Sequence, residues 1–248
     1  MNGAWTIYRR ELAGLFLSPL AWVLLCCALA FNGFFFAVYV GATGGDVGQS
    51  LALAVGGSLP FWLVMVALPP LITMRMFSEE ARTGLLEFLL TAPVTDVAIV
   101  AGKLAAATTL MGLLWSSVIG YGVLVQALGT APDWPPVISS VIGATLASAL
   151  FCSIGLAISA CTNTPILAAF LAVLANAALL ALPFLEQLLP LPKGHWGKLA
   201  LGHANLMTQF HASFGVGVLD TRQLVVFAVW TGFFVFLATR VLEARRWW

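Results

Sequence analysis

The densest group of charged residues in this sequence lies between two long apolar runs. Only 8% of the 248 residues are charged. Residues 69–103 nevertheless hold both acidic and basic side chains, namely Arg75, Glu79, Glu80, Arg82, Glu87, Asp96 and Lys103. Charges between apolar runs mark where a chain leaves the bilayer. This window is therefore the first candidate for a contact with a partner.

No catalytic motif accompanies these charges. The sequence has neither G-x-S-x-G nor H-E-x-x-H. Gly102-Lys103 and Gly197-Lys198 lack both the upstream glycine and the following serine or threonine of a phosphate-binding loop. We therefore expect a chain that is not an enzyme and binds no cofactor, with any energy supplied by another protein.

The histidines and cysteines do not predict a metal site. His195, His203 and His211 are spaced eight apart, which on a helix turns each about 80° from the last. The four cysteines form no C-x-x-C pair, so we expect free thiols in apolar surroundings, at Cys26, Cys27, Cys152 and Cys161.

Membrane spans must position the charged window. Hydrophobic residues make up 61% of the chain and its mean hydropathy is +1.00, whereas an ordinary soluble domain is about 45–50% apolar. The apolar runs predict six spans in a single all-α membrane domain over residues 1–248, at 20–40, 51–74, 98–128, 137–160, 166–185 and 224–241. Pro60 and Pro69-Pro70 predict an irregular second span.

Residues 3–18 are expected to form a helix in the membrane interface, because Arg9, Arg10 and Glu11 interrupt an apolar face and Ser18-Pro19 ends it. Six spans put both termini on one side, which also holds most Lys and Arg residues. The positive-inside rule makes that side cytoplasmic. Lys103, just inside the third span, is expected to reach the headgroups with its long stem.

Polar residues within the spans are scattered and uncharged. Asn32, Ser116 and Asn176 are candidates for a substrate path, with plain helix packing as the alternative. Gly112, Ser116 and Gly120 form a small-residue row that favours close packing of helices within the bundle. Apolar residues at helical spacing in 202–218 predict a short helix on, or dipping into, the outer leaflet.

Residues 75–97 form the predicted loop within the charged window, and Ser78 is predicted to cap a short helix there. Glu79 and Glu80 would then lie in its first turn, where the helix dipole favours acidic residues. Leucines and Phe88 would form an apolar face, and Pro93 would end the helix. Such a helix can dock into a groove on a partner. The alternative is a solvated loop whose charges only set topology.

The window resembles that of ABC-2-type transporter permeases, the six-span membrane subunits of a group of exporters. These permeases show M-R-x-x-x-E-E after the second span, then L-L-T-x-P-V, and Gly-Lys at the start of the third. The corresponding segments here are Met74-Arg75, Glu79-Glu80, Glu87 to Val94, and Gly102-Lys103. Residues 8–21, with Ser18-Pro19, are similar to the gliding-motility-type branch of these permeases.

The resemblance implies the fold of an ABC-2, type V exporter-like permease, with residues 3–18 as its connecting helix. The window would be the coupling helix, and its contact with the ATPase would involve Arg75, Glu79, Glu80, Arg82, Gly84 and Glu87. ATP hydrolysis by a separate subunit would drive export of a substrate.

The implied partners are two copies of an ATP-binding subunit that hold ATP and magnesium, and a second permease chain as homodimer or heterodimer. An additional membrane or periplasmic subunit is a further expected partner. The net charge of +1 gives no argument for nucleic acid. The implied location is the bacterial cytoplasmic membrane, with both termini inside.

Two other functions stay open at this point. The first is a membrane subunit of an ATPase-driven mechanical or assembly complex, of the gliding or envelope kind, that carries no solute. The second is an intramembrane enzyme or an unrelated small transporter. The absence of acid–base pairs from the spans argues against the second.

Overall fold

The computed structural model describes residues 2–91, 93–188 and 205–245. These residues form helices and no strand. In chain order they are α1 (Asn2–Leu17), α2 (Pro19–Ala42), α3 (Val47–Ala52), η1 (Leu53–Gly57), α4 (Leu59–Thr83), α5 (Leu85–Thr91), α6 (Asp96–Ala127), α7 (Trp134–Cys161), α8 (Pro165–Leu188), α10 (Leu206–Ser213), η2 (Phe214–Val216) and α11 (Thr221–Arg245).

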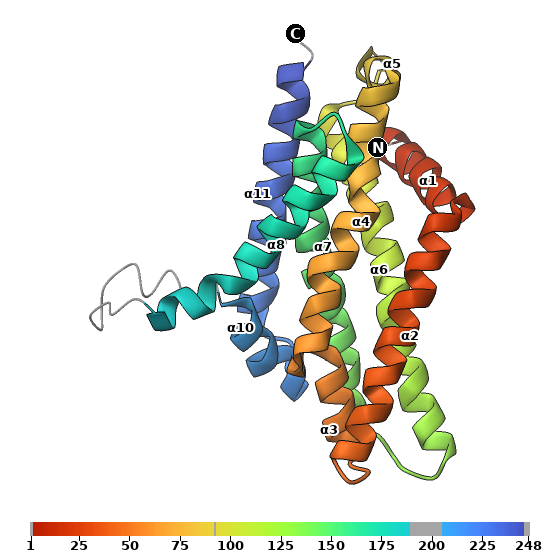
Figure 1. Cartoon of the computed structure of the whole chain (residues 1–248), viewed down its shortest axis with the longest axis vertical. Coiled ribbons are helices and arrows are strands. Elements are labelled where there is room, and N and C mark those ends of the chain that lie inside the picture. Colours follow the sequence, from red (N-terminus) through yellow and green to blue (C-terminus); the bar gives the residue numbers. More distant parts are fainter. Residues whose placement is uncertain (1, 92, 189–204, 246–248) are drawn as a thin grey trace.

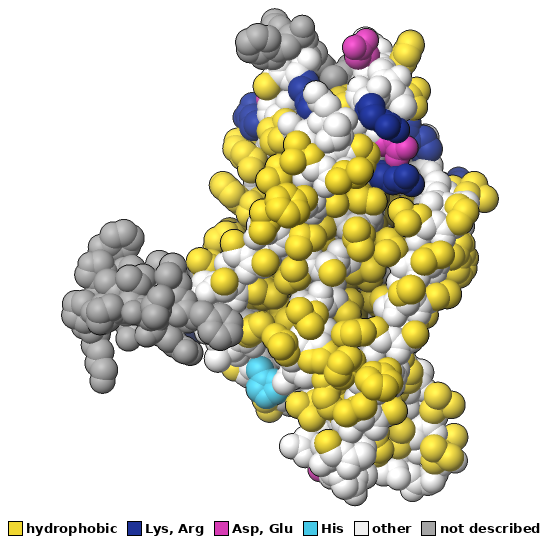
Figure 2. Space-filling model, viewed as in Figure 1, with side chains coloured by type: hydrophobic (Ala, Val, Ile, Leu, Met, Phe, Trp, Pro, Cys, Tyr) yellow, Lys and Arg dark blue, Asp and Glu magenta, His cyan; other side chains and the backbone are white. Residues whose placement is uncertain are grey.

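Among the described residues, six helical stretches are long and apolar enough to cross a membrane. They begin with α2, α3, α6, α7, α8 and α11, which confirms the predicted all-helical fold with six spans. The beginning of α1, α5 and the end of α11 lie at the same end of the bundle (Figure 1). Figure 2 shows hydrophobic side chains along the bundle and Lys, Arg, Asp and Glu gathered mainly at that end.

Helix α7 is the centre of the bundle and packs against α4, α6, α8 and α11. Many of its buried positions hold small residues, as at Ala144, Ala147 and Gly155. A β-carbon on Gly155 would lie 2.1 Å from Thr73 Oγ1 of α4. Because small residues let helix backbones approach closely, α7 can contact four neighbours at once.

The second span is irregular, as predicted, but the break is not at Pro69-Pro70; it comes just before Pro60, which lies in the first turn of α4. Helix α4 runs through Pro69 and Pro70, whereas the backbone leaves helical geometry at Val55 and Gly56 in η1. Gly56 has a φ of 89°, and a β-carbon there would lie 2.1 Å from the Phe210 ring. The break is therefore where glycine admits an aromatic ring from α10.

The predicted short helix within 202–218 exists as α10, but it packs into the bundle. Phe210 and Phe214 have no exposed surface, and the Phe210 ring lies 5.5 Å from Phe61 of α4. The expectation that this segment contacts the outer leaflet is wrong for these aromatic residues. Their burial among rings of α4 and α11, and against Gly143 of α7, supplies an apolar contact that the short helix alone could not provide.

The small-residue row on α6 does not pack as predicted. Only Gly112 faces a neighbour, since a β-carbon there would lie 3.5 Å from Thr145 of α7. Ser116 and Gly120 are exposed, and nothing lies within 4 Å of a β-carbon on Gly120. Helix α6 is close to α7 at Gly112, and the rest of the row lies on the exposed face of α6.

Candidate functional site

The charged window continues the second span as one helix. The prediction that Ser78 caps a new helix is wrong: Ser78 lies inside α4, is buried, and its hydroxyl donates to the Met74 carbonyl. Tertiary contacts support this continuation. Ser159 Oγ of α7 accepts from the backbone N–H groups of Phe77 and Ser78, at 3.2 and 3.1 Å, and donates to Met74 O at 3.0 Å.

Helix α4 ends at Gly84, one turn beyond Glu80. Gly84 has a φ of 76°, in the left-handed region where glycine is favoured. The chain then reverses into α5, which carries Glu87. The single predicted coupling helix is thus two elements, the end of α4 and the short α5, joined at a glycine.

A buried charge cluster joins the end of α4 to α1 and α6. Lys103 of α6 has no exposed surface, and its Nζ lies 2.9 Å from Glu11 Oε1 and 2.9 Å from Glu80 Oε1. It also donates to Met76 O at 2.8 Å. Arg10 Nη2 completes the cluster at 2.6 Å from Glu11 and 3.0 Å from Glu80.

The cluster corrects the expectation that Lys103 reaches the headgroups. Two carboxylates and a carbonyl lie within hydrogen-bond distance, and the ammonium also lies 5.0 Å from the centre of the Phe77 ring. A buried cation is stable only when it is paired in this way. Three helices that are far apart in sequence therefore meet at one ammonium group.

Sequence reasoning did not identify Arg10 and Glu11 as part of the site. The usable signal was the Gly102-Lys103 pair. A β-carbon on Gly102 would lie 2.9 Å from both Ala4 O and Ile7 Cγ2 of α1. The glycine lets α1 lie directly on α6, and the next residue then reaches the α1 carboxylate.

Electrostatics within the cluster favour the ionised forms. Burial alone would raise the pKa of the Glu11 carboxyl, but the charge of Lys103, the hydrogen bonds from Arg10 and Lys103, and the charge of Arg10 together lower it. Burial acts to lower the pKa of Arg10, but Glu11 and Glu80 outweigh it and raise that pKa. Both groups therefore stay charged at neutral pH.

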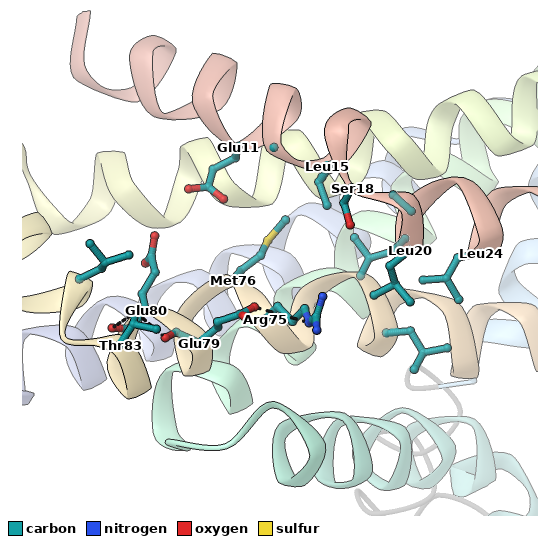
Figure 3. Close-up of a pocket in the computed structure, with 15 residues that line it drawn as sticks. Glu11, Leu15, Ser18, Leu20, Leu24, Arg75, Met76, Glu79, Glu80 and Thr83 are labelled. Atoms are coloured by element: carbon teal, nitrogen blue, oxygen red, sulfur yellow. Dashed lines mark hydrogen bonds and ion pairs between the residues drawn. The ribbon is translucent and has the colours of Figure 1, made fainter.

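Beside the cluster lies a groove of about 390 Å³ between the α1–α2 junction and α4, shown in Figure 3. We call it the elbow groove. Its polar side chains include Glu11, Arg75, Glu79, Glu80 and Thr83. Its apolar side is formed by residues of all three helices, including Leu15, Leu20, Leu24, Leu71, Ile72 and Met76.

The six residues predicted to contact an ATPase occupy different positions. Arg75 and Glu79 form an ion pair of 3.5 Å on the groove wall, and Glu80 turns inward to the cluster. Arg82 and Glu87 are exposed on either side of Gly84. Their role at an ATPase contact stays a prediction, but only some of their side chains are free to meet a partner.

The three candidate substrate-path residues do not come together. Asn32 is nearly buried beside a small cavity between α2 and α4, and Ser116 is exposed on α6. Asn176 is fully buried on α8, and neither its Nδ2 nor its Oδ1 has a hydrogen-bond partner among the described residues. A shared substrate path therefore stays a prediction.

The histidine prediction is tested only in part of the chain. His211 lies on α10, whereas His195 and His203 fall outside the described residues. No group of three potential ligands from His, Cys, Asp and Glu gathers within 2–91, 93–188 and 205–245. The expected absence of a metal site stays a prediction.

Comparison with known protein families identifies the family of this chain. Residues 58–205 match the family model described as "ABC-2 family transporter protein". The match spans more than half of the chain and includes the end of α4, α5 and Lys103. It does not distinguish the gliding-motility-type branch. No curated protein sequence matches this chain.

Proposed function

This chain belongs to the ABC-2 family of transporter proteins, and from that membership we propose that it is the permease subunit of an ABC exporter. The family is one of membrane transport components, and six apolar helices make this member a multi-pass membrane protein. In the proposal, a separate ATPase hydrolyses ATP and this chain converts the resulting movement into export of a substrate.

The observation that carries the proposal is the joining of α4, α1 and α6 through Lys103. A force applied to the end of α4 reaches α1 and α6 directly, because the ion pairs bridge them. Ser159 adds a connection to the central helix α7. Packed, bistable helix bundles convert small displacements at one end into rearrangements elsewhere.

The proposed contact with the ATPase is the surface around α5. Phe88 is 76% exposed and Leu85 is 58% exposed, and the exposed charged residues Arg82 and Glu87 lie close to them in the sequence. Protein interfaces combine apolar residues with charged residues, so this composition suits a contact with a partner. Glu80, in contrast, would act through the cluster and not through direct contact.

We propose two ATPase subunits, with ATP and magnesium bound to them, beneath two permease chains. The end of the bundle that bears α5 would be cytoplasmic, because Arg75, Arg82, Lys103, Arg240 and Arg245 belong to that end. The proposed location is the bacterial cytoplasmic membrane. An additional membrane or periplasmic subunit is also part of this proposal.

Co-purification with a soluble Walker-motif ATPase tests the proposed contact. The double variant Glu87→Arg/Phe88→Asp should lose the ATPase while its thermal unfolding stays unchanged, since both side chains are exposed. Glu243→Arg is the matched control, because Glu243 is an exposed glutamate on α11 near the same end. Equal recovery of the ATPase with both proteins would overturn the proposed contact.

Reconstituted vesicles test the transport function. The complex should hydrolyse ATP and move a candidate substrate across the bilayer only when both subunits are present. ATP turnover that depends on this chain without movement of any solute would instead favour the mechanical or assembly function.

A further inference from the structure

The elbow groove combines an apolar wall with a charged rim at the end of the bundle where charged residues gather (Figure 3). It forms because the chain turns between α1 and α2 at Ser18-Pro19, while α4 continues straight past this turn. Leu24 and Leu71 line its apolar part. A cavity of this composition suits an amphiphile whose polar group lies level with the rim.

The charges on α4 follow a definite order. Leu71 comes first on the membrane side, Arg75 follows one turn later, and Glu79 and Glu80 follow one turn after that. At 1.5 Å per residue, Arg75 and Glu79 are about 6 Å apart along the helix axis. A positive charge therefore lies closer to the apolar wall than the two negative charges.

Two of these groups retain bonding capacity within the described part of the chain. The ion pair of Arg75 uses its Nε, at 3.5 Å from Glu79. Glu80 Oε2 is buried without a hydrogen-bond partner, although Oε1 of the same carboxylate accepts from Arg10 and Lys103. That buried oxygen has no surface that a bound molecule can reach. The Glu79 side chain, in contrast, is 39% exposed and its pair with Arg75 is 3.5 Å long, so its carboxylate can accept from a bound molecule.

We propose that the elbow groove binds a phospholipid with a primary-ammonium headgroup, of the phosphatidylethanolamine type. One acyl chain lies along the leucine-lined wall, the phosphate meets Arg75, and the ammonium reaches the Glu79 carboxylate. The order of the lipid, from acyl chain to phosphate to ammonium, matches the order of apolar, basic and acidic residues along α4.

Other common headgroups fit this order less well. A glycerol headgroup has no cation, so its phosphate would meet the carboxylates without compensation. A choline headgroup keeps the cation, but its quaternary nitrogen has no N–H to donate to the Glu79 carboxylate, whereas a primary ammonium has three. The site lies mainly between α1, α2 and α4, and of the residues named in the ATPase contact above it shares Leu85 alone.

Native mass spectrometry of the purified chain tests the proposal, with phosphatidylethanolamine, phosphatidylcholine and phosphatidylglycerol of identical acyl chains. We expect the ethanolamine lipid to bind about tenfold more tightly than the others, because a hydrogen bond to a charged group discriminates by about that factor. Arg75→Gln and Glu79→Gln should each reduce its binding severalfold.

Arg240→Gln and Glu243→Gln are the matched controls, since these residues form an exposed ion pair of 2.7 Å on α11 outside the groove. They should leave lipid binding unchanged, and thermal unfolding would verify that all variants are folded. Equal binding of the three lipids would overturn the proposal. Binding that is insensitive to Arg75→Gln, as expected if a protein segment fills the groove, would also overturn it.

Discussion

Replacing Lys103 with methionine is the sharpest perturbation of the buried charge cluster. Methionine fills a similar volume but removes the ammonium that both Glu11 and Glu80 contact at 2.9 Å. The two carboxylates are then left facing each other, and the Met76 carbonyl loses its donor. Arg10 still contacts both carboxylates, so part of the charge stays compensated.

The expected cost follows from the burial of the cluster. Removing one partner of a buried ion pair costs about 3–5 kcal/mol. The side chains of Glu11 and Glu80 are only 15% and 17% exposed, so solvent screens them little. Because Arg10 stays, we expect about 3 kcal/mol. At about 2–4 °C per kcal/mol for a chain of this size, Tm should fall by about 6–12 °C.

Tryptophan fluorescence of the detergent-solubilised chain can follow this transition, since the sequence has nine tryptophans. Arg240→Met is the control, because its ion pair with Glu243 is exposed and should contribute about 0–1 kcal/mol. Lys103→Met combined with Glu11→Gln should cost clearly less than the sum of the two single variants. Additive losses, or a Tm change no larger than that of Arg240→Met, would refute the reasoning.

Three further predictions concern single positions. The pKa of the Glu11 carboxyl is lowered from its ordinary value of 4.5, so its contribution to stability is present above about pH 4.5 and is lost on acidification. Glu11→Gln should therefore flatten the decrease in Tm between pH 5 and 3. An unchanged slope of Tm against pH would contradict this. Ser159→Ala should lower the free energy of unfolding by about 1–3 kcal/mol, because the backbone N–H groups of Phe77 and Ser78 lose an acceptor. Hydrogen exchange of amides at the end of α4 should become faster. Exchange as slow as in the parent chain would argue against these two hydrogen bonds. Gly143→Ala should lower the free energy of unfolding by about 1–3 kcal/mol, because the added methyl would lie 2.5 Å from Phe214. Gly120→Ala is the control, because no heavy atom lies within 4 Å of a β-carbon there. Equal Tm values for the two variants would show that η2 moves freely to admit the methyl.

The elbow groove and the buried charge cluster share Glu11 and Glu80, and these shared residues link the two proposals physically. Glu79, the proposed partner of the lipid ammonium, is the residue directly before Glu80 on α4. A lipid ammonium at Glu79 would therefore add a charge next to the connection between α4 and α6. Lipid occupancy and the stability of the cluster should change together.

The hydrophobic pattern of the chain was sufficient to predict the number and approximate limits of the spans. An apolar helix in lipid satisfies its own backbone hydrogen bonds, so an uninterrupted apolar run of sufficient length is enough to predict it. The third span was predicted at 98–128 and is Asp96–Ala127, and the fourth was predicted at 137–160 and is Trp134–Cys161. The sequence also placed the charged window at one end of the bundle.

The tertiary structure alone decided how the charged side chains are used. Serine before two glutamates is a good local signal for a helix start, but contacts from Ser159 and Lys103 keep α4 continuous through Ser78. Lys103 pairs with Glu11, 92 positions away, because Gly102 lets α1 approach α6. No local pattern encodes such a pairing, since it depends on which helices become neighbours once the bundle has packed.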